Sequence, residues 1–102
     1  MAEFKKIGHV SDIPEGQMRS FEIGYDKIVV CHTSKGFFAL ADECSHDSGP
    51  ISEGKIAGDE IVCPRHGARF SLLTGDVTAP PALVGIDAIK IKIENDEIFV
   101  AI

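Results

Sequence analysis

Two short pairs of cysteine and histidine constrain this 102-residue chain more than any other feature. The first is Cys44-Ser45-His46 and the second is Cys63-Pro64-Arg65-His66, with sixteen residues between His46 and Cys63. Each pair offers one thiolate and one imidazole. Thiolates suit zinc or iron–sulfur clusters, and imidazole suits zinc or iron, so a fold that brings the pairs together would form a metal site. The residues by themselves leave a structural zinc ion and an iron–sulfur cluster open.

The segment that carries both pairs is punctuated by glycine and proline. Between residues 42 and 81, glycine stands at positions 49, 54, 58, 67 and 75, and proline at positions 50, 64, 80 and 81. Such punctuation indicates loops and tight turns. The embedded apolar stretches Ile61-Val62 and Phe70-Ser71-Leu72-Leu73 favour an ordered segment. We therefore expect a bound group to hold these loops together.

The flanking segments predict antiparallel β-structure. In Ile89-Lys90-Ile91-Lys92-Ile93-Glu94 apolar and charged residues alternate, as in a half-buried strand, and Asn95-Asp96 then predicts the turn of a hairpin that continues through 97–101. A second hairpin is expected from Lys27 to Asp42, and a further strand from Met18 to Ile23. No window of eleven or more residues has a helical period, so we expect an all-β chain with little helix.

Composition and length favour one domain over residues 1–102, because 44% hydrophobic residues suffice for a single core. The loop-rich part, about 42–82, would be a subdomain of it. The apolar runs are far shorter than the roughly 20 residues of a membrane helix. The charged start of the chain does not resemble a secretion signal, so we expect a cytoplasmic protein without a membrane span. Three cysteines, an odd number, favour metal binding over disulfides.

The net charge of −6 argues against binding to nucleic acid, because phosphates would repel such a surface. Acidic residues near the loops could steer a basic partner, although solubility alone explains an acidic surface. We expect them to form a solvated face. They are Asp42, Glu43, Asp47, Asp59 and Glu60.

The two pairs and their surroundings resemble the Rieske family. The resemblance extends through CSHDSGPISEG, CPRHGARFSLLTGDV and Pro80-Pro81-Ala82, and covers about residues 42–82. It implies a Rieske-like (ISP domain) antiparallel β-sandwich or barrel with a loop-rich cluster-binding subdomain. It also implies one [2Fe-2S] cluster, with one iron bound by two thiolates and the other by two imidazoles. The implied ligands, for both metal and cofactor, are Cys44, His46, Cys63 and His66.

The sequence departs from the Rieske proteins of cytochrome bc complexes at four positions near the ligands. Gly49 and Arg65 stand where those proteins have a pair of disulfide-bonded cysteines, and Ala68 and Phe70 stand where they have hydroxyl donors. At these positions the sequence resembles the soluble, low-potential branch of the family, typified by ferredoxins of ring-hydroxylating oxygenases. The sequence leaves open whether Arg65 contacts a partner or an internal carboxylate.

The resemblance implies a one-electron carrier that takes electrons from a ferredoxin reductase and passes them to a terminal oxygenase or another acceptor. The chain would then be no enzyme itself but a monomeric component of a multi-protein oxidoreductase system, with neither nucleic acid nor membrane as partner. The alternatives are a small Rieske-like subunit of a nitrite reductase-type complex and a structural zinc module. We expect Cys31 to be a core residue, and His9 and His32 to be structural or surface histidines rather than ligands.

Overall fold

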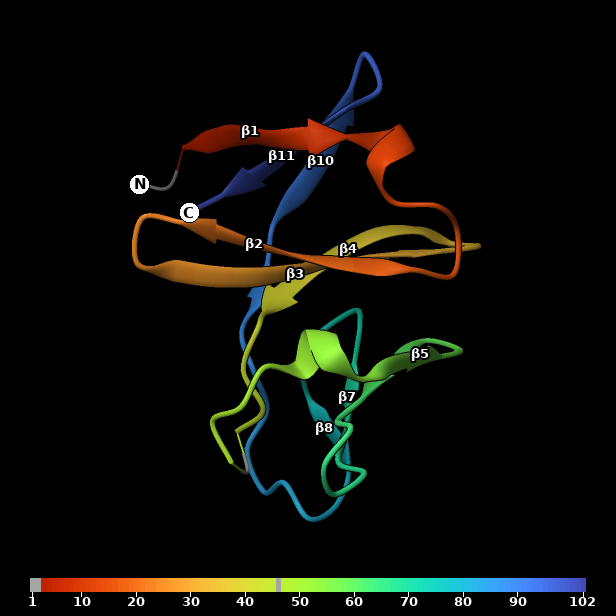
Figure 1. Ribbon diagram of the computed structural model, residues 1–102, viewed down its shortest axis with the longest axis vertical. Helices are drawn as coiled ribbons and strands as arrows, with labels where there is room; N and C mark the ends of the chain where they lie inside the picture. The colour runs from red at the N-terminus through yellow and green to blue at the C-terminus, as the bar shows by residue number, and fades with distance from the viewer. Residues whose placement is uncertain (1–2, 46) are drawn as a thin grey trace.

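The computed structural model describes residues 3–45 and 47–102, and nearly all regular structure in these ranges is β-strand (Figure 1). The helical segments in these ranges are single 3-10 turns, η1 (Val10–Asp12) and η2 (Ile51–Glu53). No helix of the described residues is long and apolar enough to cross a membrane. The expected all-β class is confirmed.

The described strands form three antiparallel sheets, stacked from top to bottom in Figure 1. The terminal sheet has the order β1 (Phe4–His9), β11 (Glu97–Ala101), β10 (Ile91–Glu94). The central sheet has the order β2 (Met18–Ile23), β3 (Asp26–Thr33), β4 (Gly36–Ala41), β9 (Ala88–Ile89). The loop sheet has the order β5 (Lys55–Ala57), β6 (Glu60–Val62), β7 (Arg69–Ser71), β8 (Val77–Ala79).

Both predicted hairpins are confirmed. Strands β3 and β4 pair with Thr33 opposite Gly36, and β10 and β11 pair with Glu94 opposite Glu97. In the second hairpin the turn residues Asn95 and Asp96 have φ values of 51° and 63°. Positive φ at both central residues is the geometry of a type I′ turn, which matches the twist of the flanking strands, and asparagine and aspartate tolerate it well.

The strand predicted over Ile89–Glu94 is divided between two sheets. Ile89 pairs with Ala39 in the central sheet, whereas Ile91 pairs with Val100 in the terminal sheet. One stretch of alternating sequence therefore joins both sheets, and Ile93, at the far end, is 42% exposed. The alternation predicted an extended chain correctly but carries no information on where that chain changes its partner strand.

Strand β3 is buried on both faces and separates two apolar cores. Ile28 and Val30 pack with residues of the terminal sheet, including Ile98, while Val29 and Cys31 pack with the core beneath the loops. Because successive side chains of a strand point to opposite faces, a run of apolar residues such as 28–31 fills both cores. The core that contains Val29 and Cys31 also contains Cys44 and Cys63, so it packs the ligand loops against the central sheet.

The cysteine and the two histidines that were expected to be structural are confirmed as such. Cys31 is fully buried, and burial, with a smaller contribution from the charge of Asp42, raises the pKa of its thiol to about 12. The His32 ring stacks on Phe37 at 4.0 Å between centroids, and its Nδ1 lies 2.7 Å from the Ile13 carbonyl oxygen. His9 caps η1.

Candidate metal centre

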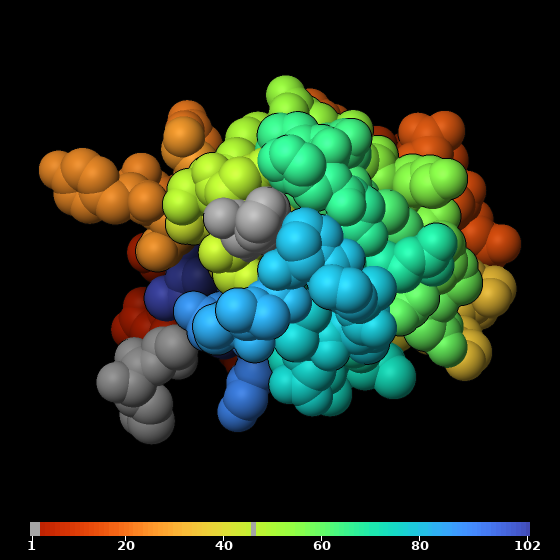
Figure 2. All heavy atoms as spheres, turned by 90° about the horizontal axis from the view of Figure 1, so that it is seen from below, coloured from red at the N-terminus to blue at the C-terminus, as the bar shows by residue number. Residues whose placement is uncertain are grey.

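The two ligand loops lie at the end of the molecule farthest from the terminal sheet (Figure 1). The first loop, residues 44–50, follows β4, and the second, residues 63–68, connects β6 to β7. Figure 2 looks onto this end, where the green, yellow-green and light-blue segments meet. The light-blue segment includes residues 80–86, the loop with the two prolines. The fold thus gathers three separate stretches of sequence at one exposed end.

The two loops share one pattern of backbone hydrogen bonds. The Cys44 N–H donates to the Gly49 carbonyl at 2.8 Å, and the Cys44 carbonyl accepts from the Ser48 N–H at 2.8 Å. In the second loop the Cys63 N–H donates to the Ala68 carbonyl at 2.7 Å, and its carbonyl accepts from the Gly67 N–H at 3.2 Å. Each cysteine therefore opens a tight loop that its own peptide groups close.

The residue four positions after each cysteine lies in the left-handed region of backbone conformation. Gly67 has a φ of 78°, which costs glycine little, and Ser48 has a φ of 61°, which costs other residues about 1–3 kcal/mol. The glycine of the second loop is visible in the sequence as a turn signal. The matching role of Ser48 is not, because serine carries no such preference.

The structure brings the two predicted cysteine ligands together. Cys44 is fully buried and Cys63 is 2% exposed. Their Sγ atoms and a carboxylate oxygen of Asp47 all lie within 4.8 Å of one another. Both cysteines belong to the core that includes Phe70, so the thiols face a site with little access to water.

Of the two predicted histidine ligands, His66 lies within the described residues. His66 lies in the second loop, its side chain is 57% exposed, and its Nδ1 is 3.8 Å from Asp47 Oδ2. Its imidazole thus reaches the carboxylate that lies beside both thiols. His46 falls outside the described residues.

The sequence suggested that Asp47 is a solvated surface acid, but the structure shows it half-buried and paired with Arg65. Arg65 Nε lies 2.5 Å from Asp47 Oδ2, and Nη2 lies 3.1 Å from Oδ1. The hydrogen bond from Arg65, and after it one from the Gly49 N–H, lower the pKa of Asp47 to about 2. Arg65 therefore binds an internal carboxylate. In the sequence, the signal for this pair was an acidic residue in one ligand loop and a basic residue in the other.

The donor set fits an iron–sulfur cluster better than a single ion held by Cys44, Asp47 and Cys63. Both Asp47 oxygens already accept hydrogen bonds from Arg65, and Oδ1 also accepts the Gly49 N–H at 3.0 Å. The carboxylate is therefore occupied, and the thiols remain as the soft donors that iron–sulfur clusters use. The described donors, two thiols and the His66 imidazole, fit a [2Fe-2S] group with mixed thiolate and imidazole ligands.

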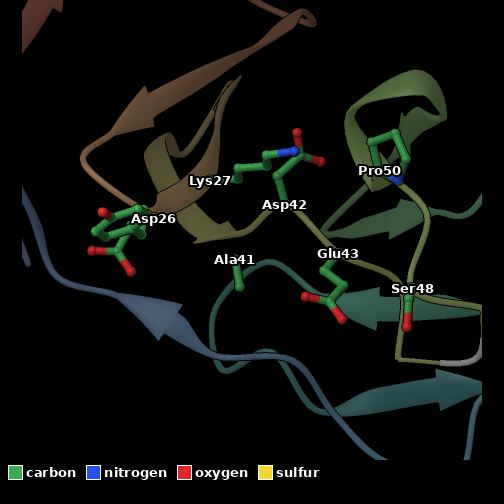
Figure 3. A pocket seen from close by; sticks show the side chains of 8 residues that line it. Asp26, Lys27, Ala41, Asp42, Glu43, Ser48 and Pro50 are labelled. Atoms are coloured by element: carbon green, nitrogen blue, oxygen red, sulfur yellow. The ribbon is translucent and has the colours of Figure 1, made fainter.

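A hollow on the surface beside the first loop is distinct from this centre (Figure 3). Its lining includes Lys27, Asp42, Glu43 and Ser48, and neither thiol. Asp42 is only 7% exposed, and its carboxylate accepts hydrogen bonds from the Ser52 N–H at 2.8 Å and from the Ser52 hydroxyl at 2.7 Å. Asp42 therefore anchors η2 to the end of β4, and it has a structural role instead of the expected place on a solvated face.

Comparison with known proteins identifies the family of the region that contains this centre. The family model described as "Rieske [2Fe-2S] domain" matches residues 3–90. The ferredoxin component of biphenyl 2,3-dioxygenase from Rhodococcus jostii is 38% identical over 95 residues, which are 93% of this chain and 89% of that protein. Human apoptosis-inducing factor 3 is 35% identical over 92% of this chain, but the chain spans only 16% of that protein's length.

A solved structure shows the same fold with sequence similarity. It is described as a complex of reduced oxygenase and oxidized ferredoxin in carbazole 1,9a-dioxygenase. Its matching chain superposes with a TM-score of 0.89 and 30% sequence identity, and the match covers 96% of this chain and 92% of that one. The predicted Rieske-like fold is thus confirmed.

Proposed function

This chain belongs to the Rieske [2Fe-2S] domain family, and from that premise we propose that it carries single electrons on one cluster held by its two loops. The family's cofactor is one [2Fe-2S] cluster with two cysteine and two histidine ligands. We assign those ligands by position in the two motifs. They are Cys44, His46, Cys63 and His66.

The observation that carries this proposal is the pair of buried thiols at an exposed end of the molecule. When bound, the cluster supplies a site that gains and loses one electron. The chain's own residues bind it through Cys44 and Cys63, while the surrounding core, including Phe70 and Leu72, excludes water. His66, 57% exposed, is the described ligand candidate nearest to solvent and offers an edge for electron exchange.

The proposed partners are a ferredoxin reductase as donor and a terminal oxygenase or similar enzyme as acceptor. Support comes from the biphenyl dioxygenase component and the carbazole dioxygenase complex described above. On this chain, Leu83 and Val84 are 89% and 68% exposed, and the Ser45 hydroxyl donates to the Val84 carbonyl. An exposed apolar pair joined to the first ligand loop suits a contact surface for a redox protein.

The same proposal treats residues 1–102 as one monomeric domain of the cytoplasm, with a cluster-binding subdomain over about 42–82. The loop sheet, from β5 to β8, falls inside that range, which supports the boundary. In this role the protein transfers electrons and leaves catalysis to the oxygenase. The comparisons do not favour the small-subunit or zinc alternatives.

The test is a reductive titration of protein purified without oxygen, followed by mixing with the terminal oxygenase of a biphenyl dioxygenase system. We expect uptake of one electron per chain and reoxidation of the reduced protein by the oxygenase. Replacing Cys44 or Cys63 by serine should abolish the visible absorption. A colourless wild-type protein that contains zinc and takes up no electron would overturn the proposal.

A further inference from the structure

Arg65 belongs to the second ligand loop, but its guanidinium group contacts the first. Nε and Nη2 form two parallel hydrogen bonds with the Asp47 carboxylate, at 2.5 and 3.1 Å. Nη1 donates to the Pro50 carbonyl at 3.0 Å and lies 3.3 Å from Glu53 Oε1 in η2. One side chain therefore joins the second loop to the first loop and to the turn that follows it.

The first loop is shaped to receive this guanidinium group. A Cβ atom placed on Gly49 would lie 2.6 Å from Arg65 Cζ and 2.7 Å from Nη2, well inside contact distance. Glycine at 49 thus lets the planar group lie directly on the backbone. The Arg65 and Asp47 side chains are only 29% and 20% exposed, so the pair is sheltered from solvent.

We propose that Arg65 is a positioning residue that fixes the separation of the two ligand loops and thereby controls how long the protein retains its cluster. The backbone bonds from Cys44 and Cys63 close each loop on itself and set its shape, but not its distance from the other loop. The proposal rests on the ligand assignment above, since it concerns the loops that carry Cys44 and Cys63.

The chemistry of this pair explains why it would matter more than an ordinary surface ion pair. Exposed pairs contribute little, because water screens them and two flexible side chains must be ordered. Here a rigid planar fork meets a carboxylate in two-point contact, half-buried, with further bonds to Pro50 and Glu53. Mutation of residues that orient metal ligands without touching the metal typically lowers metal affinity or activity by about 10–100-fold.

The first test compares Arg65→Ala with Arg69→Ala in the cluster-loaded protein. Arg69 is a matched control, because its Nη1 pairs with Glu60 Oε1 at 3.2 Å within the loop sheet. The readout is the first-order loss of visible absorption after addition of an iron chelator. We expect at least about tenfold faster loss for Arg65→Ala. For Arg69→Ala we expect a change within about twofold.

The second test removes the contact without removing the charge. The φ of Gly49 is outside the positive range, so alanine fits its backbone, but the new Cβ must push the Arg65 guanidinium group aside. We expect Gly49→Ala to speed cluster loss in the wild-type background and to add nothing in the Arg65→Ala background. Arg65→Lys keeps the charge but loses the two-point contact, and should lie between wild type and Arg65→Ala.

Equal rates of cluster loss for wild type and Arg65→Ala would overturn this inference. Additive effects of Gly49→Ala and Arg65→Ala would overturn it as well. If Arg65→Ala cannot be isolated with its cluster, Gly49→Ala and Arg65→Lys decide, and wild-type retention in both refutes it. Failure of the ligand assignment looks different, because the wild-type protein itself would then lack the Rieske spectrum.

Discussion

Replacing Ala68 by serine should raise the reduction potential. Ala68 is fully buried in the second ligand loop, and its carbonyl accepts the Cys63 N–H at 2.7 Å. Because Ala68 packs in the same core as Cys44 and Cys63, we expect a serine hydroxyl here to donate to sulfur atoms that become more negative on reduction. A hydrogen bond to a charged group contributes about 1.5–3 kcal/mol. Because a tenfold change in a one-electron equilibrium is about 59 mV, the midpoint should rise by about 60–130 mV.

The assay is a redox titration followed by visible absorption, with Ala39→Ser as the matched control. Ala39 is 3% exposed but packs in the core between the terminal and central sheets, so its serine variant should leave the potential unchanged. A shift below about 30 mV for Ala68→Ser, in a variant that keeps its cluster, would refute the reasoning. The hydroxyl would then lack an acceptor, and the free energy of unfolding should fall by about 1–3 kcal/mol.

Further predictions concern the potential, the loops, the core thiol and the contact surface. The midpoint potential of the wild-type protein should lie below about +100 mV, in the lower part of the Rieske range. A higher value would contradict the claim that the missing hydroxyl donors at positions 68 and 70 keep the potential low. Ser48→Gly should raise the free energy of unfolding in urea by about 0.5–1 kcal/mol, because φ is 61° there; a decrease would argue against backbone strain. Cys31 should resist iodoacetamide at pH 8 until the protein is unfolded. Because its pKa is raised to about 12, its contribution to stability is complete below pH 9 and is lost as the pH rises toward 12. Fast labelling of the native protein would contradict its burial. Leu83→Ser with Val84→Ser should slow electron transfer to the oxygenase at least about fivefold at unchanged potential, whereas Tyr25→Ser should not; equal rates would move the contact surface elsewhere.

The hairpins could be predicted because their signals are local. Alternation in 91–94 and the Asn95-Asp96 turn specify both strand and turn within a few residues. The division of the predicted strand at residue 90 depends instead on which distant strands, β4 and β11, lie beside it. Pairing between distant strands is a property of the whole fold, so the local pattern does not contain it.

The candidate site shows the same division between local and distant information. The motif spacing singled out Cys44 and Cys63, and the fold brings these thiols together. The assignment of His46 and His66 stays a prediction. The pairing of Asp47 with Arg65 was not predicted, because the sequence placed Asp47 on a solvated face and left the partner of Arg65 open. Its significance appears only when the Gly49 backbone is seen to make room for the guanidinium group.

The most direct test of the central claim is electron paramagnetic resonance of the reduced protein, with nitrogen hyperfine detection and histidine labelled with ¹⁵N. The account predicts one reduced [2Fe-2S] centre per chain, coupled to nitrogen from two histidine rings. One coupling should disappear in His46→Cys and one in His66→Cys. A spectrum without histidine nitrogen, or a protein that binds zinc in place of iron, would contradict the claim.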